Sequence, residues 1–226
     1  MTGLKTFSSE AAEILRDDFG AELLEQISVR MRHEYEKLRE RAEKETLPPA
    51  VAETRFLMDR SRAAENAISV AMEVAGLPCG FRRLPCNGQQ KLLAKIGRVL
   101  LIQEPLSAVG ARPQAAEYKR QLARVHSAAR QLELDLGDRP HQNVDWSGDV
   151  LAVLLHGHGR LPSDGGRLGL ASLRLAVPDA DYRNWIVNLP LERISVWGDL
   201  SRRLAEAESK DVEDRVATGL RRARSV

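Results

Sequence analysis

The sequence predicts an α+β fold, with an N-terminal helical hairpin followed by an antiparallel β-sheet that is packed by helices. Apolar residues recur every three or four positions through residues 1–76, which is the period of an amphipathic helix. From Cys79 onward the period changes to that of extended strands, and Asn87-Gly88 between two such runs is a strong hairpin signal. Strands and helices do not alternate regularly afterwards, so a doubly wound parallel sheet is disfavoured.

The first region, residues 1–76, is expected to contain three helices. Ser8 or Ser9 can cap a short first helix, and Gly20 interrupts it. Pro48-Pro49 ends the second helix, because prolines cannot donate to the helical hydrogen-bond ladder. The third helix is rich in small residues, which suits close packing in an antiparallel hairpin. The apolar stripes are Leu24, Ile27, Met31, Tyr35 and Leu38 on the second helix and Phe56, Ala63, Ala67, Val70 and Val74 on the third.

The second region, residues 77–226, is expected to hold five or six antiparallel strands, and it can form one continuous domain with the first. A helix with Pro113 in its first turn and one or two C-terminal helices complete it. Glycine-rich residues 157–166 predict a hairpin loop. A change of apolar parity along the next strand indicates either a bulge near Ala171-Ser172 or a strand buried on both faces. The expected strands lie at 81–86, 89–96, 99–103, 149–155, 168–177 and 182–189.

Composition excludes several classes of function. The chain of 226 residues carries 34 basic and 32 acidic side chains, and a net charge of +2 does not indicate a nucleic-acid or membrane partner. No apolar stretch approaches the roughly 18 residues of a membrane span, and the N-terminus lacks a signal-peptide pattern. Cys79 and Cys86 do not have the spacing of a zinc site and fit two free thiols. We therefore expect a cytoplasmic protein without a bound cofactor.

His156 and His158 form the first candidate site. Alternate residues of a strand share a face, so both imidazoles can ligate one metal ion, with Asp149, Asp164 or His141 as a third ligand. This arrangement supports an alternative function as a metal-dependent hydrolase or nuclease. Histidines at the border of a glycine-rich loop are more often loop-capping groups, so the favoured prediction has no metal.

Two acidic pairs, Glu133/Asp135 and Asp179/Asp181, form a second candidate. A restriction-type nuclease needs an acidic residue on one strand and a Glu-x-Lys motif on the next, and that motif is missing from the expected strands. Turn chemistry explains Asp179 and Asp181. Nucleophile-elbow, P-loop and dinucleotide-binding motifs are also missing from the sequence, which disfavours a conventional enzyme.

The C-terminal arginines are the third candidate. Arg221, Arg222 and Arg224 can contact phosphates or an acidic partner, which supports a nucleic-acid-associated regulator as a further alternative. Cations are also favourable at the C-terminus of a helix, so a solvated helix end is the more common explanation.

The later part of the chain carries a layout that can be compared with a known group. After the helical hairpin and the first strands come DVLAVLLHGHG at 149–159 and RLGLASLRLAVPDADYRNWIVNLPL at 167–191. In this order, residues 80–191 resemble uncharacterised small bacterial proteins that are partners in toxin–antitoxin or phage-defence pairs. The resemblance implies a protein partner and a growth-inhibiting role, and it carries over no catalytic residue.

The helical hairpin itself favours association. A hairpin of two helices cannot bury both apolar stripes alone, so the sheet or another chain must cover the remaining surface. A two-fold dimer is the commonest oligomer, and we therefore expect a homo-oligomer or a complex with a partner protein. The favoured function is that of a cytoplasmic bacterial interaction protein.

Overall fold

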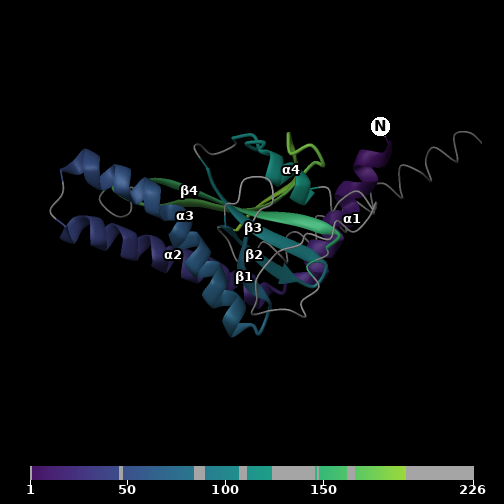
Figure 1. Cartoon of the computed structure of the whole chain (residues 1–226), viewed down its shortest axis with the longest axis horizontal. Helices are drawn as coiled ribbons and strands as arrows, with labels where there is room; N and C mark the ends of the chain where they lie inside the picture. Colours follow the sequence, from purple (N-terminus) through teal and green to yellow (C-terminus); the bar gives the residue numbers. More distant parts are fainter. Residues whose placement is uncertain are drawn as a thin grey trace, which may run out of the picture. The chain divides into compact units, whose positions relative to one another are not determined.

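The structure is a computed structural model of the whole chain (Figure 1). Met1–Glu192 form one compact unit, and Arg193–Val226 form a second unit that lies outside the described part. Within the described part, no helix combines the length and the apolar character that crossing a membrane requires. The structure describes residues 2–45, 48–83, 90–106, 111–123, 146, 148–161 and 166–191, with the side chains of the first helix described from Glu10 onward.

Three helices make up the N-terminal region, as predicted. The first helix begins at Thr2, so Ser8 and Ser9 lie inside it and the prediction that one of them caps it is wrong. No proline precedes the two serines to stop the helix from extending toward the N-terminus. Gly20 is the N-cap of the next helix and has an extended backbone, which separates the two. The helices are α1 (Thr2–Asp18), α2 (Ala21–Lys44) and α3 (Pro49–Val74).

Helices α2 and α3 lie side by side as a hairpin against the sheet (Figure 1). The whole predicted stripe of α2 is buried, and so are Phe56, Ala63 and Ala67 of the α3 stripe. The sheet covers most of what the hairpin leaves open, because α2 packs on β5 and α3 packs on β1, β2 and β3, although Val74 of the α3 stripe is exposed. The apolar surface on which the expected self-association depended is therefore largely buried within one chain.

The fold class is confirmed as α+β, with six strands in one mostly antiparallel sheet of order β1-β2-β3-β4-β5-β6. One pair differs from the expectation: β3 and β4 are parallel, so the fully antiparallel sheet is wrong at this ladder. A parallel pair needs a long crossover, and residues 107–149 between the two strands supply it. The strands are β1 (Cys79–Arg83), β2 (Gln90–Ile96), β3 (Val99–Leu106), β4 (Val150–Leu161), β5 (Arg167–Pro178) and β6 (Trp185–Pro190).

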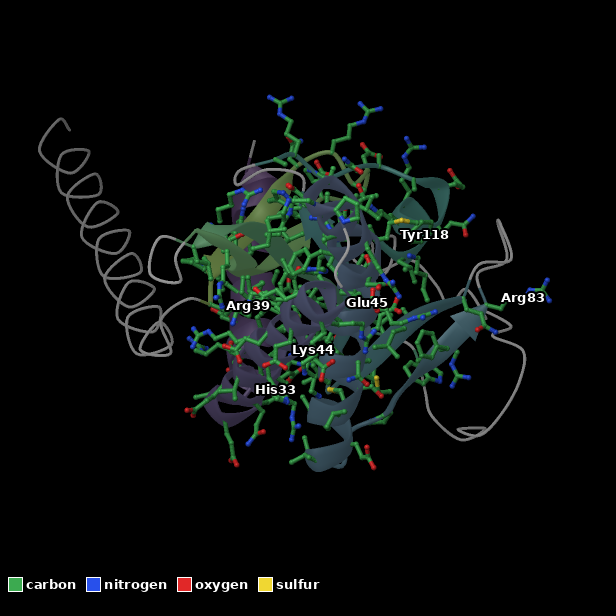
Figure 2. All side chains as sticks on the ribbon, turned by 90° about the vertical axis from the view of Figure 1, so that its left-hand side faces the viewer. His33, Arg39, Lys44, Glu45, Arg83 and Tyr118 are labelled. Atoms are coloured by element: carbon green, nitrogen blue, oxygen red, sulfur yellow. The ribbon has the colours of Figure 1, made fainter. Side chains whose placement is uncertain are left out.

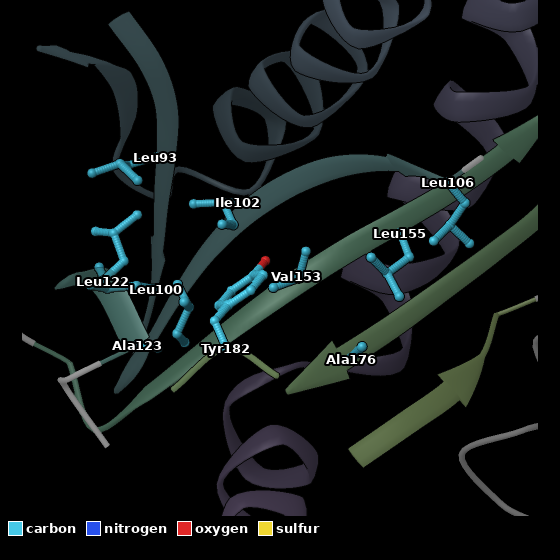
Figure 3. Close-up of a cluster of buried hydrophobic side chains, with 11 residues drawn as sticks. Leu93, Leu100, Ile102, Leu106, Leu122, Ala123, Val153, Leu155, Ala176 and Tyr182 are labelled. Atoms are coloured by element: carbon cyan, nitrogen blue, oxygen red, sulfur yellow. The ribbon is translucent and has the colours of Figure 1, made fainter. Parts of the chain in front are cut away.

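Both faces of the sheet are covered. Leu151, Val153 and Leu155 of β4 belong to a buried cluster with Leu122 of helix α4 (Glu117–Ala123) and with Tyr182 (Figure 3). The alternate residues of β4 point to the opposite face, toward α2 and α3. Burial on both faces confirms that β4 is a central strand, as its continuous apolar run predicts.

Strand β4 is longer than predicted, and this places the two histidines. It continues to Leu161, so the expected loop at 157–166 is wrong in its first half. The register changes where Gly157 faces Ser172 and His158 faces Leu170, which leaves Ala171 as the extra residue. The bulge predicted from apolar parity is thus confirmed.

Helix α4 begins at Glu117, so the prediction that Pro113 lies in its first turn is wrong. Two backbone carbonyls before the helix accept hydrogen bonds from side chains: Gln114 O from Lys119 Nζ of the helix itself (2.8 Å) and Ala111 O from the distant Trp185 Nε1 (3.1 Å). The rest of the predicted helix, the Asn87-Gly88 turn and the C-terminal helices lie outside the described residues.

The last strand begins at Trp185, three residues later than predicted. Asp179 organises the preceding turn, as expected: its carboxylate accepts hydrogen bonds from Arg183 N (2.6 Å) and from Asn184 Nδ2 (2.9 Å). Within this turn Tyr182 has φ 56°, and its ring is fully buried in the cluster on the α4 face.

Candidate functional site

The two histidines of β4 lie on one face of the strand, as predicted, and both face the helical hairpin. His156 contacts Tyr35 of α2, with ring centroids 5.9 Å apart. His158 lies near Phe56 of α3, with ring centroids 6.5 Å apart. Because both lie within the strand, the glycine-rich loop does not determine their positions.

His156 is fully buried and fully hydrogen-bonded. Its Nε2 lies 2.8 Å from Gln103 Oε1, which can only accept, so Nε2 carries the proton. Its Nδ1 then accepts from the Tyr35 hydroxyl, 2.5 Å away. Gln103 in turn donates to Glu65 Oε1 at 3.3 Å. Burial lowers the pKa of His156 to about 3, and burial likewise raises the pKa of Tyr35, so both groups are neutral at neutral pH.

His158 is held by Arg60 of α3. Arg60 Nη1 donates to His158 Nδ1 at 2.7 Å and also lies 3.1 Å from Leu106 O at the end of β3. Burial and the Arg60 guanidinium both lower the pKa of His158. A neutral imidazole that accepts at Nδ1 carries its proton on Nε2.

These hydrogen bonds bear directly on the metal-site alternative. A neutral imidazole has one nitrogen lone pair, and that of each histidine is already used, by Tyr35 for His156 and by Arg60 for His158. Asp149 precedes β4 at the other end of the strand, and His141 and Asp164 lie outside the described residues. The described residues contain no cluster of three or more metal-ligating side chains. The geometry supports a structural role that ties the hairpin to the sheet.

Two neighbouring cavities open between the hairpin and strands β4 and β5. Their volumes are about 280 Å³ and about 410 Å³. Arg39 of α2, which is labelled in Figure 2, is a lining residue of both cavities, and Tyr35 of the buried histidine network lines the larger one. The smaller cavity is lined by Arg39, Ala42, Glu43, Pro49, Ala52, Glu53, Phe56, Arg160, Arg167 and Leu168.

The cavities combine an apolar lining with charged side chains. Pro49 and Leu168 contribute apolar side chains to the lining of the smaller one, with the buried Phe56 behind them, and arginines from α2, β4 and β5 line it as well. Concave sites with an apolar lining and a few polar groups are typical of ligand and anchor-residue binding. We therefore take this pair of cavities as the candidate functional site and call it the arginine site.

A second buried polar cluster lies on the α4 face of the sheet. Lys119 Nζ is 2.7 Å from Glu104 Oε1, and the Tyr182 hydroxyl donates to Glu104 Oε2 at 2.8 Å. Burial and the Glu104 carboxylate raise the pKa of Tyr182. Both carboxylate oxygens have a partner, so this cluster stabilises the core rather than presenting groups to a ligand.

Among the described residues, the other candidates from the sequence do not line the arginine site. Cys79 is a free thiol whose pKa burial raises to about 11, so it is poorly suited to nucleophilic chemistry. Asp179 organises the turn before β6. Cys86, Glu133, Asp135, Arg221, Arg222 and Arg224 lie outside the described residues.

Sequence reasoning did not single out the arginine site. Arg39 and Glu43 lie outside the predicted apolar stripe of the second helix, and Arg160 and Arg167 lie in or beside the expected loop. One signal in the sequence indicated the contact between the hairpin and the sheet. Tyr35 lies in an apolar stripe, where its buried hydroxyl requires a polar partner, and His156 is a polar residue directly after the apolar run of strand β4.

Comparisons with protein-family models, with curated proteins and with solved structures found no match, so the geometry of the arginine site is the basis for inferring function.

Proposed function

We propose that this chain is a cytoplasmic interaction protein that binds a protein partner through the arginine site, as one component of a bacterial toxin–antitoxin or phage-defence pair. The observation that carries the binding role is the pair of adjoining cavities with an apolar lining and arginines from three elements. The layout of residues 80–191 supports the assignment to such a pair.

Protein interfaces favour this combination of groups. Arginine is enriched at interfaces because its guanidinium forms bidentate hydrogen bonds and packs on apolar surface. A cavity with an apolar lining can receive one anchor side chain, and such anchors carry most of the binding free energy. The free thiol of Cys79 is consistent with a reducing compartment.

A partner role is favoured over metal-dependent hydrolysis by the state of the two histidines. His156 and His158 would each have to lose a hydrogen bond before its lone pair could reach a metal ion. For the nucleic-acid alternative, the arginines that support it lie outside the described residues.

Co-expression with the proteins encoded by adjacent genes tests the proposal. We expect one of them to purify with the tagged chain at a fixed ratio, and we expect expression of one member alone to slow growth. Arg39→Glu should abolish the complex, because it reverses a charge that lines both cavities.

Arg120→Glu is the matched control, because Arg120 is an exposed arginine of α4 outside the arginine site. Circular dichroism confirms that both variants are folded. A chain that binds none of the adjacent products and leaves growth unchanged contradicts the proposal.

A further inference from the structure

Two ion pairs join the end of the helical hairpin to strands β4 and β5 beside the smaller cavity. Arg160 Nη2 lies 3.1 Å from Glu53 Oε2, and Arg167 Nε lies 3.7 Å from Glu43 Oε1. The side chains of Arg160 and Arg167 are 65% and 57% exposed, and those of the two glutamates are 40% and 49% exposed. Solvated pairs of this kind are weak, so each arginine can exchange its carboxylate for another at little cost.

The surroundings of these pairs are suited to an extended peptide. The apolar residues Pro49 and Leu168 line the same cavity as Arg160 and Arg167, the arginines that pair with the two glutamates. Arg39 lines this cavity and also the larger one, so a segment that leaves the first cavity meets a further guanidinium. Charge on the site is positive overall, because the two cavities are lined by Arg32, Arg39, Arg160 and Arg167 against Glu36, Glu43 and Glu53.

We infer that the arginine site binds an acidic segment of the partner by carboxylate exchange. In the free chain Glu53 and Glu43 occupy Arg160 and Arg167, and in the complex carboxylates of the partner replace them. An apolar side chain between those carboxylates enters the smaller cavity. This inference rests on the proposed function and names the chemistry by which the partner is recognised.

The lining of the cavities favours an acidic peptide over a nucleic acid. Both carry negative charge, but single-stranded nucleic acids also need exposed aromatic rings on which bases stack. Phe56 and Tyr35 are the aromatic residues that line the cavities, and each is at most 2% exposed. Carboxylates, in contrast, match the planar geometry of the guanidinium group.

The inference predicts an unusual effect of removing a glutamate. The probe is a fluorescein-labelled ten-residue peptide with one leucine flanked by Asp and Glu, and its binding to the full chain is followed by fluorescence anisotropy. Glu53→Gln should strengthen binding about twofold to fivefold, because a competing carboxylate is lost. Arg160→Ala should weaken it about threefold to tenfold, and Arg120→Ala on α4 should leave it unchanged.

Two comparisons complete the experiment. A peptide with Asn and Gln in place of the acidic residues should bind at least about tenfold more weakly, and sodium chloride should weaken only the acidic peptide. Equal binding of the two peptides, binding of neither, or weaker binding by Glu53→Gln overturns the inference. Displacement by a single-stranded oligonucleotide at lower concentration than by unlabelled acidic peptide also overturns it, in favour of a nucleic-acid site.

The failure of this inference can be told from that of the proposed function. A partner that still purifies with the chain when Arg160 and Arg167 are both alanine shows that recognition does not use carboxylate exchange, although partner binding stands. If the acidic peptide binds as expected but no adjacent protein purifies with the chain, the proposed pair fails while the site chemistry stands.

Discussion

Acidification from pH 6.5 to pH 5 is expected to destabilise the fold through His156. In the unfolded chain this imidazole has its ordinary pKa of about 6.5, whereas burial lowers its pKa to about 3 in the folded chain. Between these values the unfolded state binds more protons than the folded state, so the free energy of unfolding falls as the pH falls. The slope is about 0.7 kcal/mol per pH unit at pH 6.5, where half of the unfolded imidazole is protonated, and it approaches about 1.4 kcal/mol per pH unit near pH 5. The loss over this window is therefore about 1.6 kcal/mol.

Urea unfolding at pH 6.5 and pH 5, followed by tryptophan fluorescence, measures this loss. The window lies above the ordinary pKa of carboxylates at about 4, so their titration contributes little. His156→Gln retains a polar side chain but does not titrate, and it should remove most of the pH dependence. The burial-lowered pKa of His158 acts in the same direction, so a smaller part remains in this variant.

His33→Gln is the matched control for the exchange of histidine for glutamine, because His33 is exposed on α2 and lies outside the buried network (Figure 2). If wild type and His156→Gln lose the same free energy between the two pH values, the argument from a buried neutral imidazole is refuted. The argument is also refuted if the free energy of unfolding of the wild type falls by less than about 0.5 kcal/mol between the two pH values, because the lowered pKa of His156 requires a fall several times larger.

Three substitutions test other contacts. Lys119→Met leaves the Glu104 carboxylate buried without its cation and should cost about 3–5 kcal/mol in urea unfolding; a second change, Glu104→Gln, should restore part of it. Gly157→Ala would place a Cβ 2.3 Å from Ser172 Oγ and should cost about 1–3 kcal/mol. Thermal melting should show that Ser172→Ala rescues it, because this buried hydroxyl has no hydrogen-bond partner among the described residues. Tyr35→Phe removes the donor to the buried imidazole and should cost about 1–3 kcal/mol in urea unfolding, and an unchanged midpoint would contradict that contact.

The elements themselves were largely predictable from local pattern. The apolar stripe of α2 and the parity change at Ala171 depend on neighbours within a few residues, and the structure confirms both. Helix and strand ends were less predictable, because distant groups determine them. Trp185 donates to the Ala111 carbonyl before α4 from 74 residues away, and no local signal around Pro113 reveals that contact.

The candidate site was not predictable for a related reason. Arg39 of α2 and Arg160 of β4 are separated by more than a hundred residues in the sequence. The packing of α2 against β5, the neighbour of β4, brings the two side chains to one cavity. The parallel pairing of β3 and β4 had a usable signal in the continuous apolar run of β4. That run also fits a central antiparallel strand, so pattern alone did not decide between the two.

The one parallel ladder also determines the order in which the fold can assemble. Strands β1 to β3 and strands β4 to β6 each form a meander in which every neighbour follows directly along the chain. The β3–β4 ladder must close a much longer loop, so its entropic cost is greater and it is expected to form last. Because α2 and α3 belong to the first half and β4 and β5 to the second, the arginine site is created by that final step. A chain that is still folding therefore lacks the arginine site, and the proposed partner is expected to bind only molecules that have completed the sheet.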